Sequence, residues 1–275
     1  MTNLYEHLVL RNQGYISKAL QERISNTKVL VVGCGIGSQV AEAAARIGFQ
    51  NFVLVDGDTI DSHNLNRQSF FFDQIGKYKV DALKENILRI NPEAKVDAHP
   101  TLVSTENVKS FMESIDLVFD TVDFLDLSGI IAVHDEAHLQ KKYLVSSFAV
   151  GFGAAVISLP PTNRDHAWAR DIFNLPAKGN VDSSSYVTHF IDLFSKLATE
   201  LDPKVVEVMQ GVFAQLADGK ACPAPQVSPG AYTVASACLT AAVKMLDNEN
   251  LTLGPEMVVV NLVKQLTSPG IKLVA

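Results

Sequence analysis

A glycine-rich segment that follows a short apolar run has the residue types of a phosphate-binding turn. The segment is Gly33-Cys34-Gly35-Ile36-Gly37-Ser38, and the run before it covers residues 29–32. Between a strand and a helix, such a turn presents backbone N–H groups and a helix N-terminus to phosphate oxygens. Asp56 ends the next apolar run, about 20 residues further on, where ribose hydroxyls are usually held. The alternative is a tight turn without a ligand; the pattern itself favours a nucleotide but does not choose among NAD, FAD and ATP.

The residues after Asp56 are amide and cationic side chains rather than an apolar slot for a nicotinamide ring. Asp58 is followed by Asn64, Arg67 and Gln68 in NLNRQ, and then by Lys79 in GKYK. Arginine offers a planar fork of donors and lysine a mobile point charge, and both suit a polyphosphate. Taken singly, Arg67 and Lys79 are equally compatible with surface charges. Taken in this order, the residues favour ATP over a dinucleotide.

Two further carboxylates, Asp120 and Asp123, follow the apolar run at residues 117–119. Open α/β sheets bind ligands at the carboxyl ends of their strands. A carboxylate there, facing a triphosphate, is a natural ligand of Mg²⁺, which takes one or two carboxylates together with phosphate oxygens. The simpler interpretations are a helix cap for Asp120 and a solvated loop acid for Asp123. Together with the preceding residues, the pair predicts a Mg²⁺·ATP site.

Short apolar runs alternate with helical patterns over the first half of the chain. Strands are expected at residues 29–32, 52–55, 95–98, 117–119 and 143–146, and helices at 39–47, 80–90 and 105–113, with Gly48 as a helix C-cap. This alternation predicts an α/β, Rossmann-like, mostly parallel sheet with helices on both faces. The pattern breaks near residues 159–161. Helices at 184–216, divided at Asp202-Pro203, an apolar helix at 231–243 and a strand at 256–263 form a C-terminal elaboration.

The second half is expected to pack on the same sheet, so we divide the chain into residues 1–158 and 159–275. The net charge of −7 over 275 residues argues against a nucleic-acid groove as the main function. The apolar run at 231–243 is shorter than the roughly 20 residues that span a bilayer. Three cysteines cannot make a disulfide framework. With no targeting segment recognised, a cytoplasmic protein without a membrane partner is expected.

VLVVGCGIGS, LVDGD, NLNRQ, IGKYK, INP and DTVD, in that order, resemble the ThiF/MoeB/HesA superfamily over residues 10–158. These are ubiquitin-activating-enzyme-like adenylyltransferases. The resemblance implies a Rossmann-like fold that binds ATP and Mg²⁺. It also implies transfer of AMP to a carboxylate of a peptide or small β-grasp protein, with release of pyrophosphate. The glycine loop departs from the family's GxGGxG pattern, being one residue shorter and followed by Ser38.

The resemblance also implies roles for individual residues. Asp56 would hold the ribose, Asp123 would position Mg²⁺, and Arg11 would reach the triphosphate of a partner subunit, which implies a homodimer. The implied catalytic residues are Arg11, Arg67, Lys79 and Asp123. The implied nucleotide-binding residues are Gly33, Gly35, Gly37, Asp56, Asp58, Asn64, Arg67, Gln68, Lys79 and Asp120.

Many members of the superfamily carry two CxxC pairs that bind zinc and a further cysteine that forms a thioester. Cys34, Cys222 and Cys238 make neither pair, so no structural zinc is expected. Cys222 lies in a Pro-rich loop and is the thiol with the most plausible exposure. The pattern fits branches that modify peptides. A branch that dehydrates a tRNA-borne carboxylate fits less well, because the chain is acidic.

His134 and His138 have the i, i+4 spacing of a helical metal site, but an exposed helix face near acidic residues is the simpler interpretation. Trp168, the single tryptophan, is either part of a substrate-facing loop or, as we prefer, an apolar anchor. Two other functions stay open at this point. One is a nucleotide-binding dimeric module without catalysis, and the other is an NAD-dependent oxidoreductase.

Overall fold

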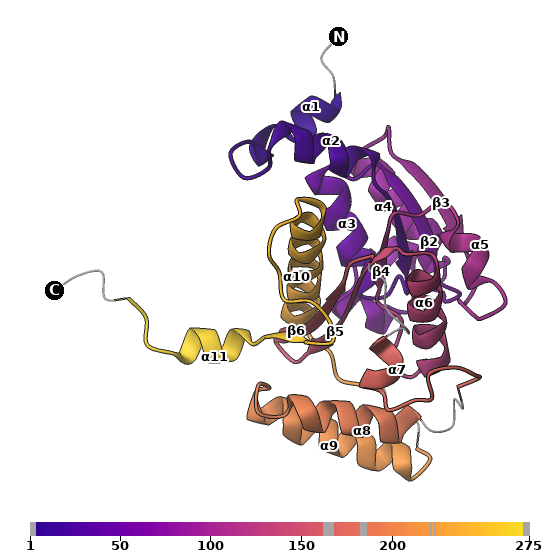
Figure 1. Cartoon of the computed structure of the whole chain (residues 1–275), viewed down its shortest axis with the longest axis vertical. Helices are drawn as coiled ribbons and strands as arrows, with labels where there is room; N and C mark the ends of the chain where they lie inside the picture. Colours follow the sequence, from indigo (N-terminus) through magenta and orange to yellow (C-terminus); the bar gives the residue numbers. More distant parts are fainter. Residues whose placement is uncertain (1–3, 162–167, 182–185, 221, 223, 272–275) are drawn as a thin grey trace.

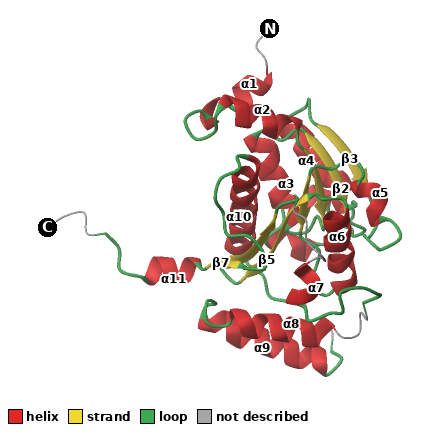
Figure 2. Cartoon of the chain, in the orientation of Figure 1, coloured by secondary structure: helices red, strands yellow, loops and turns green. Residues whose placement is uncertain are grey.

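A seven-stranded sheet forms the centre of the computed structural model, which describes residues 4–161, 168–181, 186–220, 222 and 224–271. The spatial order is β3-β2-β1-β4-β5-β6-β7 (Figure 2). The strands are β1 (Lys28–Val32), β2 (Asn51–Val55), β3 (Lys95–His99), β4 (Leu117–Asp120), β5 (Tyr143–Val150), β6 (Gly153–Leu159) and β7 (Val258–Val260). Strands β1 to β5 pair in parallel, whereas β6 is antiparallel to both β5 and β7. The predicted α/β class with a mostly parallel sheet is confirmed.

Helices cover both faces of the sheet (Figure 1). One face carries α2 (Lys18–Asn26), α3 (Gly37–Ile47), α4 (Lys79–Ile90) and α10 (Ser228–Leu246). The other face carries α5 (Val108–Met112) and α6 (Leu127–Leu139). Below them lie α7 (Trp168–Ile172), α8 (Tyr186–Leu197) and α9 (Pro203–Ala217). The chain begins with α1 (Leu4–Leu8) and η1 (Leu10–Asn12), and α11 (Leu262–Thr267) extends away from the body.

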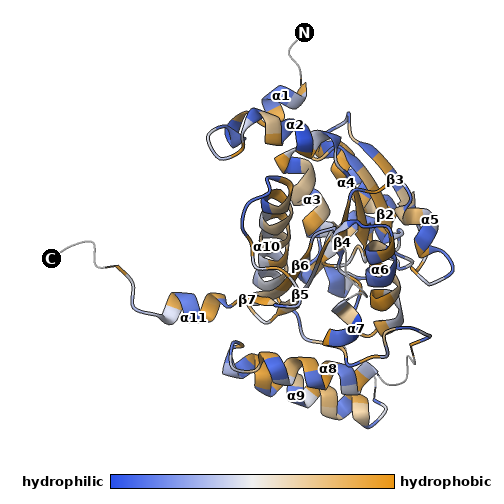
Figure 3. Cartoon of the chain, viewed as in Figure 1, coloured by the Kyte–Doolittle hydropathy of each residue, from blue (hydrophilic) through white to orange (hydrophobic). Residues whose placement is uncertain are grey.

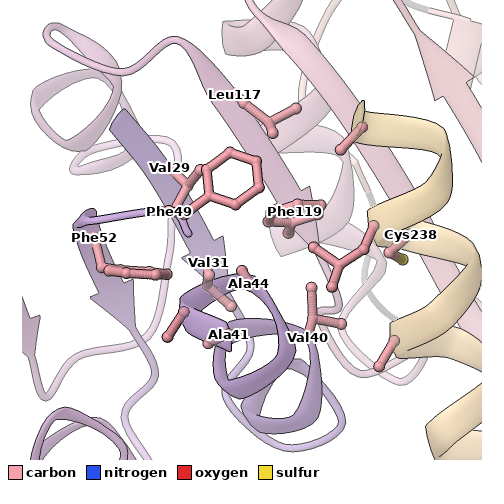
Figure 4. Packing of buried hydrophobic residues seen from close by; sticks show 14 of the residues in the cluster. Val29, Val31, Val40, Ala41, Ala44, Phe49, Phe52, Leu117, Phe119 and Cys238 are labelled. Atoms are coloured by element: carbon pink, nitrogen blue, oxygen red, sulfur yellow. The ribbon is translucent and has the colours of Figure 1, made fainter. Parts of the chain in front are cut away.

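Apart from Lys28, Asn51 and Asp120 at their ends, strands β1, β2 and β4 are apolar because both of their faces are buried. On β1, Val29 and Val31 belong to the core under α3 and α10, together with Phe119 of β4 (Figure 4). Leu30 and Val32 point into the opposite core under α5 and α6. Burial on two faces explains the continuous Val and Leu runs from which the sequence predicted buried parallel strands.

The helices end or begin at the residues that the sequence predicted as helix boundaries. Gly48 has a φ of 114° and its N–H donates to Ala44 and Ala45, which closes α3 in a left-handed C-cap as predicted. Helix α4 ends at Ile90, before Asn91 and Pro92. Asp202 caps α9 by accepting from Lys204 N–H, with Pro203 at the first helical position. The predicted division of the second helical region is therefore confirmed.

Helices α8 and α9 pack against each other, and apolar and polar residues alternate along both of them (Figure 3). Phe190 of α8 and Phe213 of α9 belong to a third core cluster, which also contains Leu127 of α6. This cluster places the α8–α9 pair next to the carboxyl ends of β4 and β5. Trp168 is half-buried against Gly254, where an added Cβ would lie 2.6 Å from its ring, so it has the environment of an apolar anchor.

The structure differs from the predictions mainly after residue 146. Strand β5 continues to Val150 and turns into β6, a strand that was not predicted from the sequence. The expected strand at 256–263 is only β7, and α11 begins at Leu262. Helix α5 is also shorter than the expected 105–113. Within the described residues, none of the helices combines the length and apolar character needed to cross a bilayer.

Candidate nucleotide-binding site

A cavity of about 810 Å³ opens at the carboxyl ends of β1, β2 and β4. The order of the sheet reverses between β1 and β4, the place where open α/β sheets bind ligands. Most of the residues expected at the site line this cavity: Gly33, Gly35, Asp56, Asp58, Asn64, Arg67, Gln68, Lys79 and Asp123. Gly37, Asp120 and Arg11 do not line it. The structure thus brings together side chains from three separate stretches of sequence.

The glycine loop is pressed against the turn that follows β4. Gly33 has a φ of +81°, and a Cβ atom there would lie 2.4 Å from the carbonyl oxygen of Thr121. A Cβ atom at Gly37 would lie 2.3 Å from Thr121 Oγ1, so Gly37 permits close packing without lining the cavity. Ser38 Oγ donates to Gly35 O at 2.6 Å and accepts from Ser69 N–H at 2.9 Å. Where the dinucleotide pattern has a third glycine, this serine joins the loop to the segment that carries Arg67.

Asp56 is a buried carboxylate with two fixed hydrogen bonds. It accepts from the N–H of Cys34 at 2.6 Å and from the N–H of Asp58 at 2.8 Å. Burial raises the pKa of Asp56, and the charge of Lys79 partly offsets that rise. Lys79 Nζ lies 2.6 Å from Asp58 Oδ2 and 4.0 Å from Asp56 Oδ2. The lysine therefore stands between two carboxylates at the cavity, while Asp56 can accept a hydrogen bond from a ribose hydroxyl.

The affinity for ATP is expected to fall on acidification, beginning at a higher pH than an ordinary aspartate would give. The carboxylate form of Asp56 is the form that accepts from a ribose, and its pKa in the free protein is raised by burial. Binding is then lost as the pH falls through that raised pKa. Calorimetric titration of ATP between about pH 8 and 5 tests this, with Asp56→Asn expected to bind about tenfold more weakly.

The matched comparison for this prediction is the pH profile of the Asp56→Asn variant. Its remaining pH dependence reports ATP itself, and the difference from the unmodified protein reports Asp56. Lys79→Ala should move the fall in affinity to a still higher pH, because the lysine charge lowers the pKa of Asp56. Identical profiles for the unmodified protein and Asp56→Asn would exclude the assigned role.

Arg67 is held by three hydrogen bonds that leave its planar group at the cavity. Its Nη1 donates to His63 O at 3.1 Å and to Asn66 Oδ1 at 2.8 Å, and its Nε donates to Gln226 Oε1. Burial lowers the pKa of Arg67, and nearby Asp123 opposes that shift. Asn66 Nδ2 also donates to Gln226 O at 3.0 Å. Gln226 thus links the segment at residues 224–227 to the loop that carries Asn66 and Arg67.

Asn64 and Gln68 flank Arg67 on the same loop, in and just after η2 (Ser62–Asn66). Asn64 Oδ1 accepts from Asp61 N–H at 2.9 Å, which shapes the turn before Arg67. Gln68 is 8% exposed, and its Oε1 is buried without a hydrogen-bond partner in the structure. Its amide nitrogen would lie 3.2 Å from a Cβ atom at Gly35. Gln68 therefore packs against the glycine loop at Gly35, and its Oε1 remains available to accept a hydrogen bond.

The two carboxylates after β4 have different surroundings. Asp123 is exposed at the cavity, and its Oδ1 accepts from Leu125 N–H at 3.0 Å. Asp120 is 2% exposed and does not reach the cavity; its Oδ2 lies 3.1 Å from His134 Nε2 and accepts from Ser146 Oγ at 2.7 Å. The alternative of a helix cap for Asp120 is wrong, because α6 is capped by Asp126.

His134 is also buried, at 4% exposure, so the expectation of an exposed face is wrong for this residue. Arg11 is exposed on η1 and lies outside the cavity of its own chain.

Cys34 and Cys238 are buried, and burial raises the pKa of Cys238 to about 12. Cys222 is half-buried and does not line the cavity. In the described part of the chain, no three His, Cys, Asp or Glu side chains come together as a possible metal site.

The second half of the chain contributes residues to the cavity that the sequence did not predict. They are Phe148, Phe152, Phe194, Lys204, Met209 and Gln226, among others. These residues come from β5, α8, α9 and neighbouring loops, and their motifs carry no local chemical signature. The packing of the α8–α9 pair against the sheet brings Phe194, Lys204 and Met209 to the site, and the extension of β5 into the β5–β6 turn brings Phe148 and Phe152.

Comparison with known proteins gives a consistent family and fold. The profile of the ThiF family matches residues 9–272. The chain is 38% identical over 120 residues to the tRNA threonylcarbamoyladenosine dehydratase of Bacillus subtilis (strain 168). This alignment covers 42% of this chain and 47% of that protein. The chain is 34% identical over 126 residues to SUMO-activating enzyme subunit 2 of Dictyostelium discoideum, covering 45% of this chain and 18% of that protein. The match thus spans less than half the length of either relative.

Two solved structures show the same fold. The E. coli MccB structure with ATP has a TM-score of 0.64 at 21% identity and covers 92% of this chain and 67% of that one. E. coli tRNA N6-threonylcarbamoyladenosine dehydratase has a TM-score of 0.62 at 19% identity, covering 88% of this chain and 95% of that one. The resemblance carried by the glycine loop, NLNRQ and the spaced lysine is confirmed. The chain belongs to the ThiF family.

Proposed function

We propose that the protein is an ATP-dependent adenylyltransferase that activates a carboxylate as acyl-AMP and releases pyrophosphate. The observation that carries this proposal is the convergence of Asp56, Arg67, Lys79 and Asp123 on one cavity at the switch point of the sheet. Asp56 would accept from the ribose, and the cations Arg67 and Lys79 would face the phosphates. The exposed carboxylate of Asp123 would hold Mg²⁺. A nicotinamide-dependent reaction would have no use for this set.

The chemistry that these residues support is positioning with electrostatic stabilisation. Arg67 and Lys79 would neutralise charge on the α-phosphate and on the departing pyrophosphate. The attacking carboxylate is already ionised at neutral pH, so the reaction needs no general base. A Mg²⁺ ion bound with the triphosphate would supply further charge neutralisation. Asp123 has the donor chemistry for it, because Mg²⁺ takes one or two carboxylates and completes its shell with phosphate oxygens.

The acceptor of AMP, in this proposal, is a carboxylate of a peptide or small β-grasp protein. Similar proteins suggest several kinds of substrate, since they include a SUMO-activating subunit, a tRNA dehydratase and MccB bound to MccA. Residues 1–158 would carry the nucleotide, and residues 159–275 would serve substrate binding and dimerisation. Arg11 would act on the triphosphate of the partner in a cytoplasmic homodimer, which fits its exposed position outside its own cavity.

The test is ATP–pyrophosphate exchange, which should require both Mg²⁺ and a suitable carboxyl substrate. Calorimetry with ATP separates binding from turnover in the same preparation. Tight ATP binding without exchange across a panel of carboxylates and peptides would instead support a nucleotide-binding module. Binding of NAD without binding of ATP would exclude the proposed function altogether.

A further inference from the structure

The cavity continues past Asp123 into a region of different chemistry. Nucleotide-side residues come from β1, β2 and the loop after β2, whereas this region is formed by β5, the β5–β6 turn, α8 and α9. We call it the apolar lobe and define it by the lining side chains Phe148, Phe152, Phe194, Val205, Val208 and Met209. Because β4 lies between β1 and β5, the lobe and the glycine loop flank Asp123 from opposite sides.

The walls of the apolar lobe belong to the packed interior. The ring of Phe194 lies 5.8 Å from that of Phe148 and 5.4 Å from that of Phe213. Met209 is 9% exposed within the same core cluster. The β5–β6 turn is fixed against α9, because a Cβ atom at Gly151 would lie 2.5 Å from Val205 Cγ2. The lobe is therefore a preformed surface, as ligand pockets usually are.

Phe152 is the residue of the lobe whose exposure indicates a ligand. It lies at the β5–β6 turn and is 51% exposed while lining the cavity. An aromatic side chain left half in water beside a polar nucleotide site gains stability when an apolar group covers it. The occupant must reach Asp123 at one end and the aromatic walls at the other.

The two charged residues at the edge of the lobe, Lys204 and Asp202, already make contacts within α9. Lys204 pairs with Glu207 at 2.7 Å, and the carboxylate of Asp202 caps α9. An acidic or basic group placed among Phe148, Phe194 and Met209 would lose its hydration without gaining a counter-ion, which is costly. The lobe therefore selects against charged side chains.

We infer that the apolar lobe binds the side chain of the residue whose carboxyl group is adenylated. The substrate then ends in a bulky apolar residue such as Leu or Phe, not in the Gly-Gly of a β-grasp modifier. This inference rests on the proposed function, because the carboxylate must lie beside Asp123 and Arg67 for the lobe to receive the attached side chain. A Gly-Gly terminus would leave the half-exposed ring of Phe152 uncovered.

The experiment uses N-acetylated hexapeptide pools that differ only in the fixed last residue: Leu, Phe, Gly, Glu or Lys. ATP–pyrophosphate exchange is measured for each pool with the full chain, after calorimetry has shown that ATP binds. The Leu and Phe pools should support exchange about 10- to 100-fold faster than the Gly pool, with the Glu and Lys pools slower still. Equal exchange in all pools, or a preference for Gly or Glu, would contradict the inferred role of the apolar lobe. The proposed adenylyltransferase function would still stand. No exchange in any pool would count against both proposals.

A charge placed at the lobe gives the second measurement. Phe152→Lys is expected to lower exchange with the Leu pool about tenfold and to raise exchange with the Glu pool, because the new cation can pair with an acidic side chain. Phe152 is half exposed, so the substitution does not open the core. The matched control is Phe72→Lys, at an 82% exposed position outside the cavity, which should keep the ranking of the pools. An unchanged ranking in Phe152→Lys would contradict the inference.

Discussion

Asp123→Ala is expected to lower ATP–pyrophosphate exchange by about 10³-fold, with little effect on thermal stability. The carboxylate is exposed at the cavity and accepts from the N–H of Leu125, which is an exposed residue, so its removal does not leave a buried residue without its partner. Its position close to Arg67, whose pKa it raises, places its charge beside the cation assigned to the phosphates. Losing that charge removes the group that would orient Mg²⁺ on the triphosphate.

Asp123→Asn distinguishes charge from shape at this position. The amide keeps the acceptor for Leu125 N–H but lacks the negative charge, so its exchange rate should stay near that of Asp123→Ala. A higher Mg²⁺ concentration should partly restore exchange in both variants, because weak metal binding is overcome by mass action. Asp73→Ala, at an exposed acid outside the cavity, is the matched control and should exchange like the unmodified protein. Full exchange by Asp123→Ala would rule out its assignment.

The part of the site that the sequence could predict depends on local rules. Gly33 and Asp56 each follow a strand whose continuous apolar residues marked it as buried in a parallel sheet. Carboxyl ends of parallel strands meet at one edge, so residues separated along the chain could be placed together without coordinates. Lys79 could be placed less surely from the sequence, because its contact with Asp58 depends on how the loop after β2 returns to the sheet.

Asp120 shows where local rules were incomplete. Side chains alternate along a strand, so Asp120 shares the side of Val118, which faces the core under α6. Its partners there are His134 of α6 and Ser146 of β5, both distant in sequence. No spacing rule links these three residues, because the pairing of β4 with β5 and the packing of α6 decide it. The same applies to Phe194 and Gln226, whose place at the cavity is a consequence of tertiary packing.

Strand β6 was missed for a related reason. Its sequence, GAAVISL, is buried at every position and lacks the polar alternation of a half-exposed strand. Gly153 lies where a Cβ atom would be 2.1 Å from Val260 O, a contact with β7 that comes from about 100 residues further along the chain. A short apolar run of this kind does not reveal its pairing direction, so the antiparallel turn after Val150 was visible only in the structure.

Arg67→Ala should reduce exchange by about 10³-fold, the scale of an arginine that stabilises charge in phosphoryl transfer. Its guanidinium is half-buried and held on two sides, by Nη1 to His63 O and by Nε to Gln226, so the group is positioned before ATP arrives. Arg67→Lys keeps the charge but loses the fork, and it should recover only part of the activity. Arg46→Ala, which removes an exposed arginine paired with Glu42, is the matched control.

Gln226→Ala separates the position of Arg67 from its charge. The substitution leaves the arginine in place but removes the acceptor of its Nε–H, and a single hydrogen bond of this kind corresponds to about a fivefold loss in exchange. In the Arg67→Ala background the Gln226→Ala substitution should add little, because a positioning residue has no effect once the group that it positions is gone. Independent, multiplicative losses in the double variant would show that Gln226 acts on the substrate directly. Since Gln226 comes from the segment next to α10 and Arg67 from the loop after β2, non-additive losses would demonstrate that the second half of the chain completes the phosphate-binding side.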